Sequence, residues 1–209
     1  MILLNSTPIK TMTINKLVAQ TRTCRRFTGS PITTSTLMNL IELARLSGSA
    51  RNGQPWQYSI INDQQSCCDI FPHLGWAGYL ADWKGPAPEE RPTAYILCLL
   101  NHDRLNVAEK HAHFDLGIAS QNILLGACEQ HILGCRIGAF SPEITRTFNI
   151  PDNLTLELII ALGEPKEKIV IEEAKDKNDI QYWRDTDQIH HVPKRPLKEL
   201  LVTLERTTD

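Results

Sequence analysis

The segment from Ala112 to Leu133 constrains the fold most, because its apolar residues lie almost all round a helix rather than on one face. These residues are Phe114, Leu116, Ile118, Ile123, Leu124, Leu125, Cys128 and Ile132. A helix with such a surface is buried on more than one side, and a monomer of this size would struggle to cover it. We expect the helix to stop at Gly134, since glycine commonly follows a last helical turn.

Other segments show the periodicity of shorter elements. Residues 13–21 carry a short helical pattern. Thr33 to Leu46 carries a clearer one, with apolar residues at three- and four-residue steps behind a cluster of hydroxyl side chains able to cap a helix. Residues 56–61 and 154–162 are typical of strands, and residues 93–100 of a strand buried on both faces. A further short helix is expected to begin at Ser141-Pro142.

Two irregular segments separate these elements. Residues 75–91 are rich in Gly, Pro and Trp, and we interpret them as a lid or pocket wall. Within them Trp76, Tyr79 and Trp83 could cover a planar substrate, although such spacing more often reflects packing. Residues 166–177 are expected to be a charged, solvated stretch. We interpret residues 1–12 as an ill-ordered N-terminal extension. Residues 13–209 then form a single domain.

Composition excludes several functions. The chain has 209 residues, and its net charge of −2 provides no field that would gather nucleic acid. No run approaches the ~20 apolar residues that span a bilayer, and the amino terminus lacks the pattern of an export signal. We therefore expect a cytoplasmic protein without membrane or nucleic-acid partners.

The six cysteines form an even count, but several lie inside apolar periodic segments. A cytoplasmic chain of this length needs no disulfides for stability. We expect reduced thiols at Cys24, Cys67, Cys68, Cys98, Cys128 and Cys135.

Two motifs occur in a fixed order along the chain. The basic cluster of residues 22–27 (RTCRRF) precedes an amphipathic helix, and residues 49–56 (SARNGQPW) then open an apolar run. This arrangement resembles the flavin-dependent nitroreductase family. The likeness continues in residues 115–121, 134–140, 162–165 and 193–195, and covers roughly residues 13–201.

The resemblance implies a fold, a cofactor and an assembly. The expected fold is α+β, with a mainly antiparallel sheet of four or five strands flanked by helices. The helix of residues 112–133 would lie at the centre of a homodimer interface that holds two FMN molecules. NAD(P)H would transfer hydride to flavin N5 and leave, and a nitroaromatic or quinone would then be reduced in a ping-pong cycle. The flavin performs this chemistry, so we assign no side-chain acid or base.

The basic cluster matches the turn that holds the FMN phosphate in the family. Arg22, Thr23 and Arg25 fall on that turn, and an arginine fork binds phosphate oxygens in pairs. Many family members carry a basic residue where this chain has Thr21, so part of the grip is expected from Arg22 or from the carboxy-terminal pair Lys194-Arg195. The alternative is a solvated basic turn.

The second motif matches the loop that lines the flavin in the family, often the flavin of the partner subunit. Asn52 and Gln54 can offer donors and acceptors to the ring edge, while Pro55 and Trp56 fix the turn. Ser49 and Ala50 belong to the same expected contact. The alternative is a turn whose amides cap backbone groups.

A third segment, Cys135 to Phe140, resembles the one that passes the reactive edge of the flavin. The backbone N–H of Gly138 is expected near N5, with Ile137 and Ala139 on either side. Glycine there allows the main chain to approach the ring closely. A plain turn after a helix is the alternative.

Other constellations suggest no chemistry. His111, His113 and Asp115 cannot all share one helix face, and nothing completes a tetrahedral metal set, so we expect no metal. His190-His191 is expected to be a surface pair. Hydrolase and NTPase motifs are missing from the sequence. Within the resemblance two other functions stay open: a specialised member such as a dehalogenase or flavin-consuming enzyme, and a flavin-binding protein without turnover.

Overall fold

The computed structural model of the chain describes residues 12–80, 82–204 and 206, so most of the expected N-terminal extension lies outside the described residues. The helices are α1 (Ile14–Gln20), α2 (Thr34–Arg45), α3 (Gln64–Ile70), α4 (Glu109–Glu129), α5 (Glu143–Thr147) and α6 (Leu197–Leu200). The strands are β1 (Trp56–Ile61), β2 (Ala94–Asn101), β3 (Leu133–Ile137), β4 (Leu154–Gly163), β5 (Ile169–Glu173), β6 (Trp183–Arg184) and β7 (His190–Lys194).

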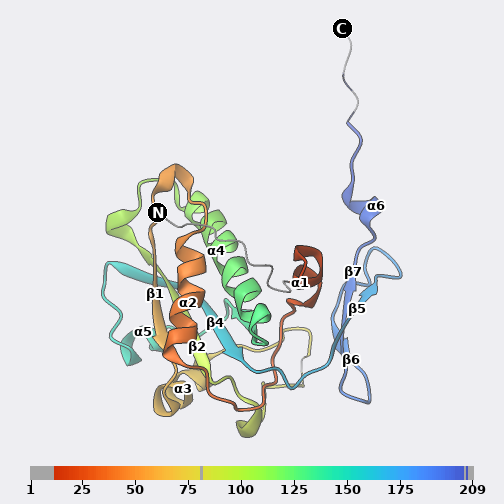
Figure 1. Cartoon of the computed structure of the whole chain (residues 1–209), viewed down its shortest axis with the longest axis horizontal. Coiled ribbons are helices and arrows are strands. Elements are labelled where there is room, and N and C mark those ends of the chain that lie inside the picture. Colours follow the sequence, from red (N-terminus) through yellow and green to blue (C-terminus); the bar gives the residue numbers. More distant parts are fainter. Residues whose placement is uncertain (1–11, 81, 205, 207–209) are drawn as a thin grey trace.

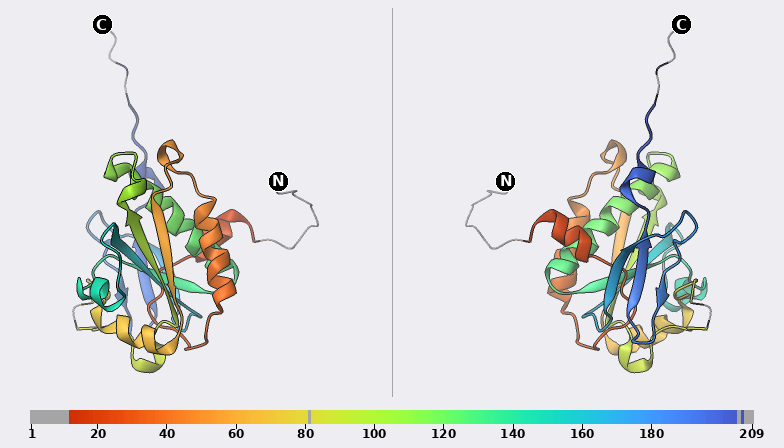
Figure 2. Two further views of the ribbon diagram at one scale, coloured as in Figure 1. Left: turned by 90° about the vertical axis from the view of Figure 1, so that its left-hand side faces the viewer. Right: turned by 90° about the vertical axis from the view of Figure 1, so that its right-hand side faces the viewer.

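The main sheet has four strands in the order β1-β2-β4-β3, and every neighbouring pair is antiparallel. Helices α2 and α4 pack against each other and cover one face of this sheet (Figure 1). The other face packs against α3 and α5 (Figure 2). This arrangement confirms the expected α+β fold with a mainly antiparallel sheet.

Strand β2 joins the two halves of the core. Its side chains alternate between the faces of the sheet, and all of them are buried. Ala94, Ile96 and Cys98 pack toward α2 and α4, whereas the side chains between them pack toward α3 and α5. The prediction of a strand buried on both faces is therefore confirmed.

Hydroxyl caps begin the first two helices, close to the predicted positions. The side chain of Thr13 accepts a hydrogen bond from the N–H of Lys16, and the side chain of Thr33 accepts one from Thr36. Each satisfies a backbone donor that the first helical turn leaves free. Helix α2 then buries Leu37, Leu40 and Ala44 against the sheet, as its periodicity predicts.

The predicted boundaries of the long helix were wrong. Helix α4 ends at Glu129, and His131 takes the left-handed conformation with φ of 59° that closes its last turn. The N–H of Ile132 bonds the carbonyl of Ala127 across that turn. Gly134 is no helix stop but a residue of β3, where a Cβ atom would lie 2.6 Å from the carbonyl oxygen of Ala161.

A second, three-stranded sheet was not predicted. Residues 166–177 were expected to be solvated, but they contain β5, which pairs in parallel with β7 in the order β5-β7-β6. This small sheet lies to the side of the main one (Figure 1). Helix α3, whose N-cap Asp63 accepts from the N–H of Ser66, was also missed.

The segment interpreted as a lid or pocket wall, in its described residues 75–80 and 82–91, contacts both the main body and the small sheet. Its start pairs with the segment after β3, where the N–H of Gly75 bonds the carbonyl of Ala139 at 2.7 Å. Further on, Tyr79 packs on Tyr182 with ring centroids 5.0 Å apart. Arg184 lies 4.3 Å above the ring of Trp83. Trp76 instead packs against Phe71, so the three aromatic residues form no single stripe.

The six cysteines are all free, as predicted. Burial raises the pKa of Cys24 and of Cys98 to about 12, which keeps both thiols protonated and unreactive. Among the described residues, no helix has the length and apolar character needed to cross a membrane.

Candidate functional site

A basic pocket of about 340 Å³ opens between the main sheet and the small sheet. Four cationic side chains, three neutral polar residues, a tyrosine, a histidine and two aliphatic residues line it; no described acidic residue does. The lining residues are Thr21, Arg22, Thr23, Arg25, Gln121, Leu124, Arg136, Tyr182, His190, Val192 and Lys194. Such a surface favours an anion.

Backbone pairing places the basic cluster in this pocket. Thr23 forms an isolated parallel bridge with Gly134, and the N–H of Cys24 bonds the Gly134 carbonyl at 3.0 Å. The chain that carries Arg22 and Arg25 therefore runs beside β3, whose Arg136 completes the cationic lining. The sequence motif and the pocket coincide at Arg22, Thr23 and Arg25.

Arg25 is the most enclosed of these cations, with only 8% of its surface exposed. Its guanidinium lies 4.7 Å from the centre of the Tyr182 ring, and Nη1 lies 3.4 Å from Nε2 of His190. The buried carboxylate of Glu167 accepts the backbone N–H of Arg25 at 2.8 Å and pairs with Arg184 at 2.6 Å. Glu167 thus offsets charge behind the pocket without lining it.

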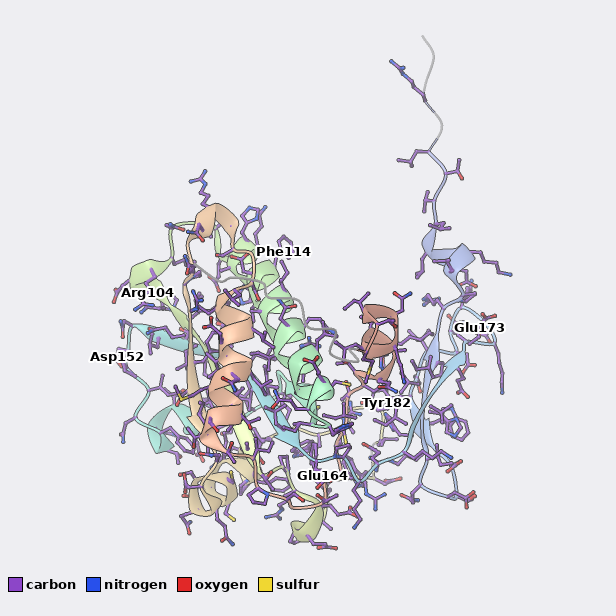
Figure 3. The ribbon with its side chains drawn as sticks, in the orientation of Figure 1. Arg104, Phe114, Asp152, Glu164, Glu173 and Tyr182 are labelled. Carbon is purple, nitrogen blue, oxygen red and sulfur yellow. The ribbon has the colours of Figure 1, made fainter. Side chains whose placement is uncertain are left out.

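Among the pocket residues that sequence reasoning missed are Arg136, Tyr182 and His190. Arg136 donates to Ser120 at 2.9 Å and to Gln121 at 2.8 Å, so two side chains of α4 hold its guanidinium in place. Tyr182 comes directly before β6 (Figure 3), and His190 is the first residue of β7. No local pattern indicates the small sheet, and the prediction of a surface His190-His191 pair was wrong for His190, which is 1% exposed.

The two residues of the carboxy-terminal pair, Lys194 and Arg195, have different surroundings at the end of β7. Lys194 lines the basic pocket. Arg195 does not line it; its Nη1 lies 3.6 Å from Glu199 on the next helical turn. Thr21, where a further basic residue was sought, donates its hydroxyl to the carbonyl of Leu17 at 2.8 Å and closes α1.

The motif loop, residues 49–56, is fastened to α4. Asp115 accepts the hydroxyl of Ser49 at 2.8 Å and the N–H of Ala50 at 2.9 Å. The N–H of Gln54 then bonds the Ser49 hydroxyl at 3.0 Å. At the far end, the indole of Trp56 donates to the carbonyl of Ala112 at 2.8 Å. The loop is anchored at both ends, while the side chains of Asn52 and Gln54 stay exposed.

The backbone of the motif loop is strained. Arg51, Asn52 and Gln54 all adopt positive φ, with values of 52°, 54° and 48°. Residues other than glycine seldom adopt this conformation, and it costs of order 1–3 kcal/mol each. Strain of this kind persists only where the surroundings impose it, and it concentrates at functional sites. The amide of Gln54 donates to Oδ1 of Asn52 at 3.0 Å, which orients the two predicted contact residues together.

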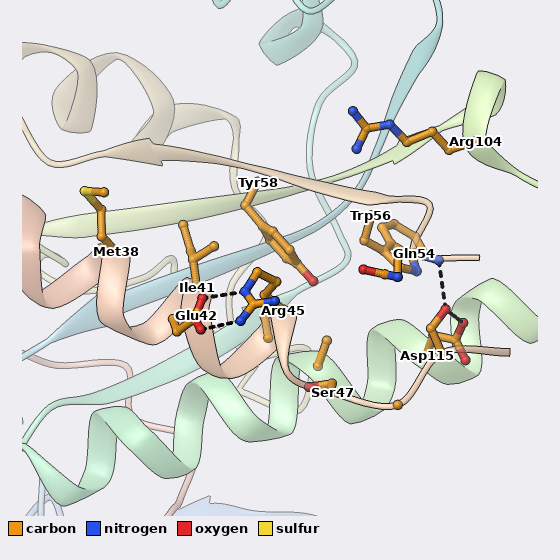
Figure 4. A pocket seen from close by; sticks show the side chains of 14 residues that line it. Met38, Ile41, Glu42, Arg45, Ser47, Gln54, Trp56, Tyr58, Arg104 and Asp115 are labelled. Carbon is orange, nitrogen blue, oxygen red and sulfur yellow. Dashed lines mark hydrogen bonds and ion pairs between the residues drawn. The ribbon is translucent and has the colours of Figure 1, made fainter. Parts of the chain in front are cut away.

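A groove of about 520 Å³ runs from the motif loop along α2 and β1 (Figure 4). Met38, Ile41, Trp56 and Tyr58 form much of its apolar wall. Gln54 and Asp115 lie at one end of it, and Ser49 also lines it. Because Met38 is 61% exposed, the groove presents an apolar surface that the described residues do not cover.

The segment after β3 leaves open space at the predicted flavin contact. Gly138 and Ala139 are exposed, whereas the side chain of Ile137 is buried in the core. A Cβ atom added to Gly138 would have no heavy atom within 4 Å, and the residue has no positive φ. The side of the backbone on which a Gly138 side chain would stand is therefore open among the described residues.

The motif loop and the basic pocket lie on opposite sides of α4. Asp115 and Ala119 face the groove beside the loop, and Gln121 and Leu124 face the basic pocket. With 3.6 residues per turn, these two pairs point in nearly opposite directions. One chain therefore does not bring all the predicted cofactor residues together.

His111, His113 and Asp115 do not form a group of metal ligands, since Asp115 accepts hydrogen bonds from the motif loop instead. Among the described residues, the ligand atoms of a different set lie within 4.8 Å of one another: Glu109, His113 and Glu157. Two of these three residues are exposed. Exposed groups of this kind are common without any ion.

Comparison with known proteins identifies the family. The sequence model of the nitroreductase family matches residues 18–164. The chain belongs to the nitroreductase family. Among curated proteins, this family member is 23% identical over 181 residues to the iodotyrosine dehalogenase 1 homolog of Caenorhabditis elegans. The alignment covers 75% of the chain but only 56% of that relative's length.

Solved structures share the fold of this nitroreductase-family chain. A protein of Desulfovibrio desulfuricans, described as a nitroreductase in complex with FMN, is 22% identical, with a TM-score of 0.67 over 94% of this chain and 100% of the other. A nitroreductase family protein of Clostridium difficile is 18% identical, with a TM-score of 0.65 over 92% and 100%. The NADPH:FMN oxidoreductase of Vibrio harveyi, complexed with NAD+, is 16% identical, with a TM-score of 0.63 over 93% and 78%.

Proposed function

We propose that this nitroreductase-family chain is an FMN-dependent NAD(P)H oxidoreductase that acts on nitroaromatic or quinone-type acceptors. The observation that carries the proposal is the basic pocket, formed where the family's phosphate motif meets β3 and the small sheet. When bound, FMN would supply the hydride chemistry, and the protein would orient donor and acceptor. The Desulfovibrio structure with FMN and the Vibrio oxidoreductase with NAD+ support the choice of cofactor and donor.

The chemistry of the pocket fits a phosphate monoester. Arg22, Arg25, Arg136 and Lys194 supply positive charge, and no described carboxylate lines the pocket to repel an anion. The Nε atoms of Arg22 and Arg25 are buried and have no hydrogen-bond partner among the described residues. Buried polar groups are nearly always paired in native structures, so these two donors favour an anionic occupant. The hydroxyl of Thr23 adds a further donor.

The ring of the flavin would lie along Gly138 and Ala139. Gly138 has no side chain and open space at its Cβ position, which supports a close approach of the ring to this backbone and a contact between its N–H and the N5 atom. Cations and backbone donors nearby would stabilise the negative charge of a reduced flavin. We assign no side-chain acid or base to the reaction.

A homodimer would complete the site. The motif loop of one copy cannot reach the basic pocket on the far side of its own α4, so a second copy is needed to unite the two. Helix α4 exposes Phe114 (Figure 3) and Ile118, at 66% and 48%, and neither residue lines the groove or the basic pocket. The carboxy-terminal segment after β7 is also apolar and exposed, at Leu197, Leu200, Leu201, Val202 and Leu204. A second copy of the chain would cover both surfaces.

Dehalogenation is a second candidate, because the Caenorhabditis relative is named as an iodotyrosine dehalogenase homolog. A dehalogenase would use the same cofactor site and differ at the lid segment, where Tyr79 and Trp83 dock on the small sheet. A flavin-binding protein without turnover would differ in failing to oxidise NAD(P)H.

The proposal is tested by purifying the protein and identifying what it holds. We expect a yellow protein that releases intact FMN on denaturation. Colourless protein that cannot be reconstituted with FMN would overturn the proposal. Steady-state assays with nitroaromatics, quinones and halogenated phenols then distinguish the two enzyme classes.

A further inference from the structure

His190 is the most unusual residue of the basic pocket. It lies on β7, where its backbone N–H bonds the carbonyl of Lys168 at 2.8 Å, and only 1% of its surface is exposed. Its ring packs 5.3 Å from that of Tyr182, which itself lies beneath Arg25. The ring is thus held rigidly between the small sheet and the phosphate motif.

The neighbours of His190 determine its tautomer. Nε2 lies 3.4 Å from Nη1 of Arg25, and a guanidinium can only donate. Nε2 therefore accepts, and in the neutral ring the proton must reside on Nδ1. That Nδ1 atom is buried and has no partner among the described residues. A buried N–H without an acceptor is costly, and the ring lines the basic pocket.

Burial and the nearby positive charges keep His190 neutral. Burial lowers the pKa of His190 first of all, and Arg25, Arg184 and His191 lower it further, while Glu167 opposes them. Arg22, Arg136 and Lys194, which line the same pocket, have the same sign of charge as an imidazolium. The ring is therefore available near neutral pH as a fixed, uncharged donor.

We propose that His190 donates its Nδ1 proton to a terminal oxygen of the FMN phosphate and so contributes to the selection of FMN over unphosphorylated riboflavin. This inference rests on the proposed function, because it assigns FMN to the basic pocket. The phosphate is the anionic group of FMN, and its terminal oxygens have more lone pairs than the paired donors of two arginines can fill. Riboflavin lacks this acceptor and gains nothing from His190.

The test compares FMN and riboflavin dissociation constants for two matched variants. Asn and Leu have nearly the same branched shape, but His190→Asn keeps an N–H near the position of Nδ1, whereas His190→Leu removes it. We expect His190→Leu to weaken FMN about tenfold or more, the usual effect of losing a hydrogen bond to a charged group. Riboflavin affinity should change less than about twofold, and His190→Asn should keep most of the FMN preference. His191→Leu is the control, since the His191 ring stacks on Trp183 outside the pocket.

The outcomes separate this inference from the proposed function. A wild-type preference for FMN that persists unchanged in His190→Leu would overturn the role of His190 and leave the function intact. Equal losses of FMN and riboflavin would mean that His190 is only structural. Wild-type protein that binds neither flavin would overturn both proposals. Nitrogen NMR of wild-type protein gives a reading that needs no variant: FMN, but not riboflavin, should shift the protonated Nδ1 resonance of His190.

Discussion

Asp115 of α4 accepts the Ser49 hydroxyl at 2.8 Å and thereby ties the motif loop to the helix that separates it from the basic pocket. The same carboxylate accepts the N–H of Ala50. These bonds hold a loop in which Arg51, Asn52 and Gln54 adopt positive φ. Without an anchor, the strained backbone would relax.

Asp115→Ala should therefore release the motif loop. The two donors of Ser49 and Ala50 would lose their acceptor, which destabilises the fold by about 1–3 kcal/mol. Denaturant unfolding measures this loss, and trypsin cleavage after the exposed Arg51 should accelerate. Cleavage after Lys175 serves as the control. Asp115→Asn, which keeps one acceptor oxygen, should lose less, and equal stability of the alanine variant and wild type would refute the anchor.

Arg25→Ala should weaken FMN by about 2–4 kcal/mol, because hydrogen bonds between a guanidinium and a phosphate in a mostly buried site are lost. Riboflavin binding should change far less. The control is Lys175→Ala, which removes an exposed cation of the small sheet's loop. Flavin titration monitored by fluorescence gives both constants. Unchanged FMN affinity in Arg25→Ala would place the phosphate elsewhere.

The stability of the flavin-free protein should fall in acid because of His190. Burial lowers the pKa of His190 to about 4, whereas an unfolded histidine titrates near ~6.5. Between these values the unfolded chain binds the extra proton, so the free energy of unfolding decreases as pH drops. The slope from this one group is at most about 1.4 kcal/mol per pH unit.

His190→Asn is the comparison for that pH effect. Burial opposes protonation of His191, but hydrogen bonds to Asp185 and Glu172 raise its pKa, so its contribution has the opposite sign. That contribution is common to both proteins and cancels in the difference. We expect the difference in stability between wild type and His190→Asn to vary from pH 7 to pH 4. A constant difference would contradict a neutral buried His190.

The chain should be a dimer at micromolar concentration. Light scattering should give twice the 23.6 kDa of one chain. Ile118→Glu, at an exposed position of α4, should both shift the measured mass toward that of the monomer and lower the affinity for FMN. Ile180→Glu, at a similarly exposed position before β6, should do neither. A flavin-bound protein that stays at the mass of one chain would refute the proposed interface.

The residues that sequence reasoning placed correctly are those whose signals are local. The periodicity of Leu37, Leu40 and Ala44 indicates α2, and the continuous apolar run indicates β2, because helix and strand periods are visible within a few residues. The basic cluster is also a local signal, but its role was inferred from the resemblance to the family. Its position in a pocket depends on pairing between Thr23 and Gly134, which are far apart in the sequence.

Features that depend on distant pairing were missed. The sequence of β5 was interpreted as part of a charged, solvated stretch, because the strand depends on its pairing with the distant β7. The same pairing buries His190. From the sequence alone, two adjacent histidines near the end of the chain are expected to be exposed. The end of α4 was misplaced for a different reason: His131 takes the left-handed conformation usually given to glycine. Gly134, which was expected to end the helix, is instead a residue of β3.

The central claim is that this chain carries electrons between NAD(P)H and an acceptor through FMN held at the basic pocket. Anaerobic mixing of the FMN-reconstituted protein with NADH or NADPH tests it most directly. We predict that the visible absorbance of one flavin per chain is bleached by at least one of the two, and that a quinone or nitroaromatic restores it. Flavin that stays oxidised with both nucleotides, in protein that binds FMN stoichiometrically, would contradict the account.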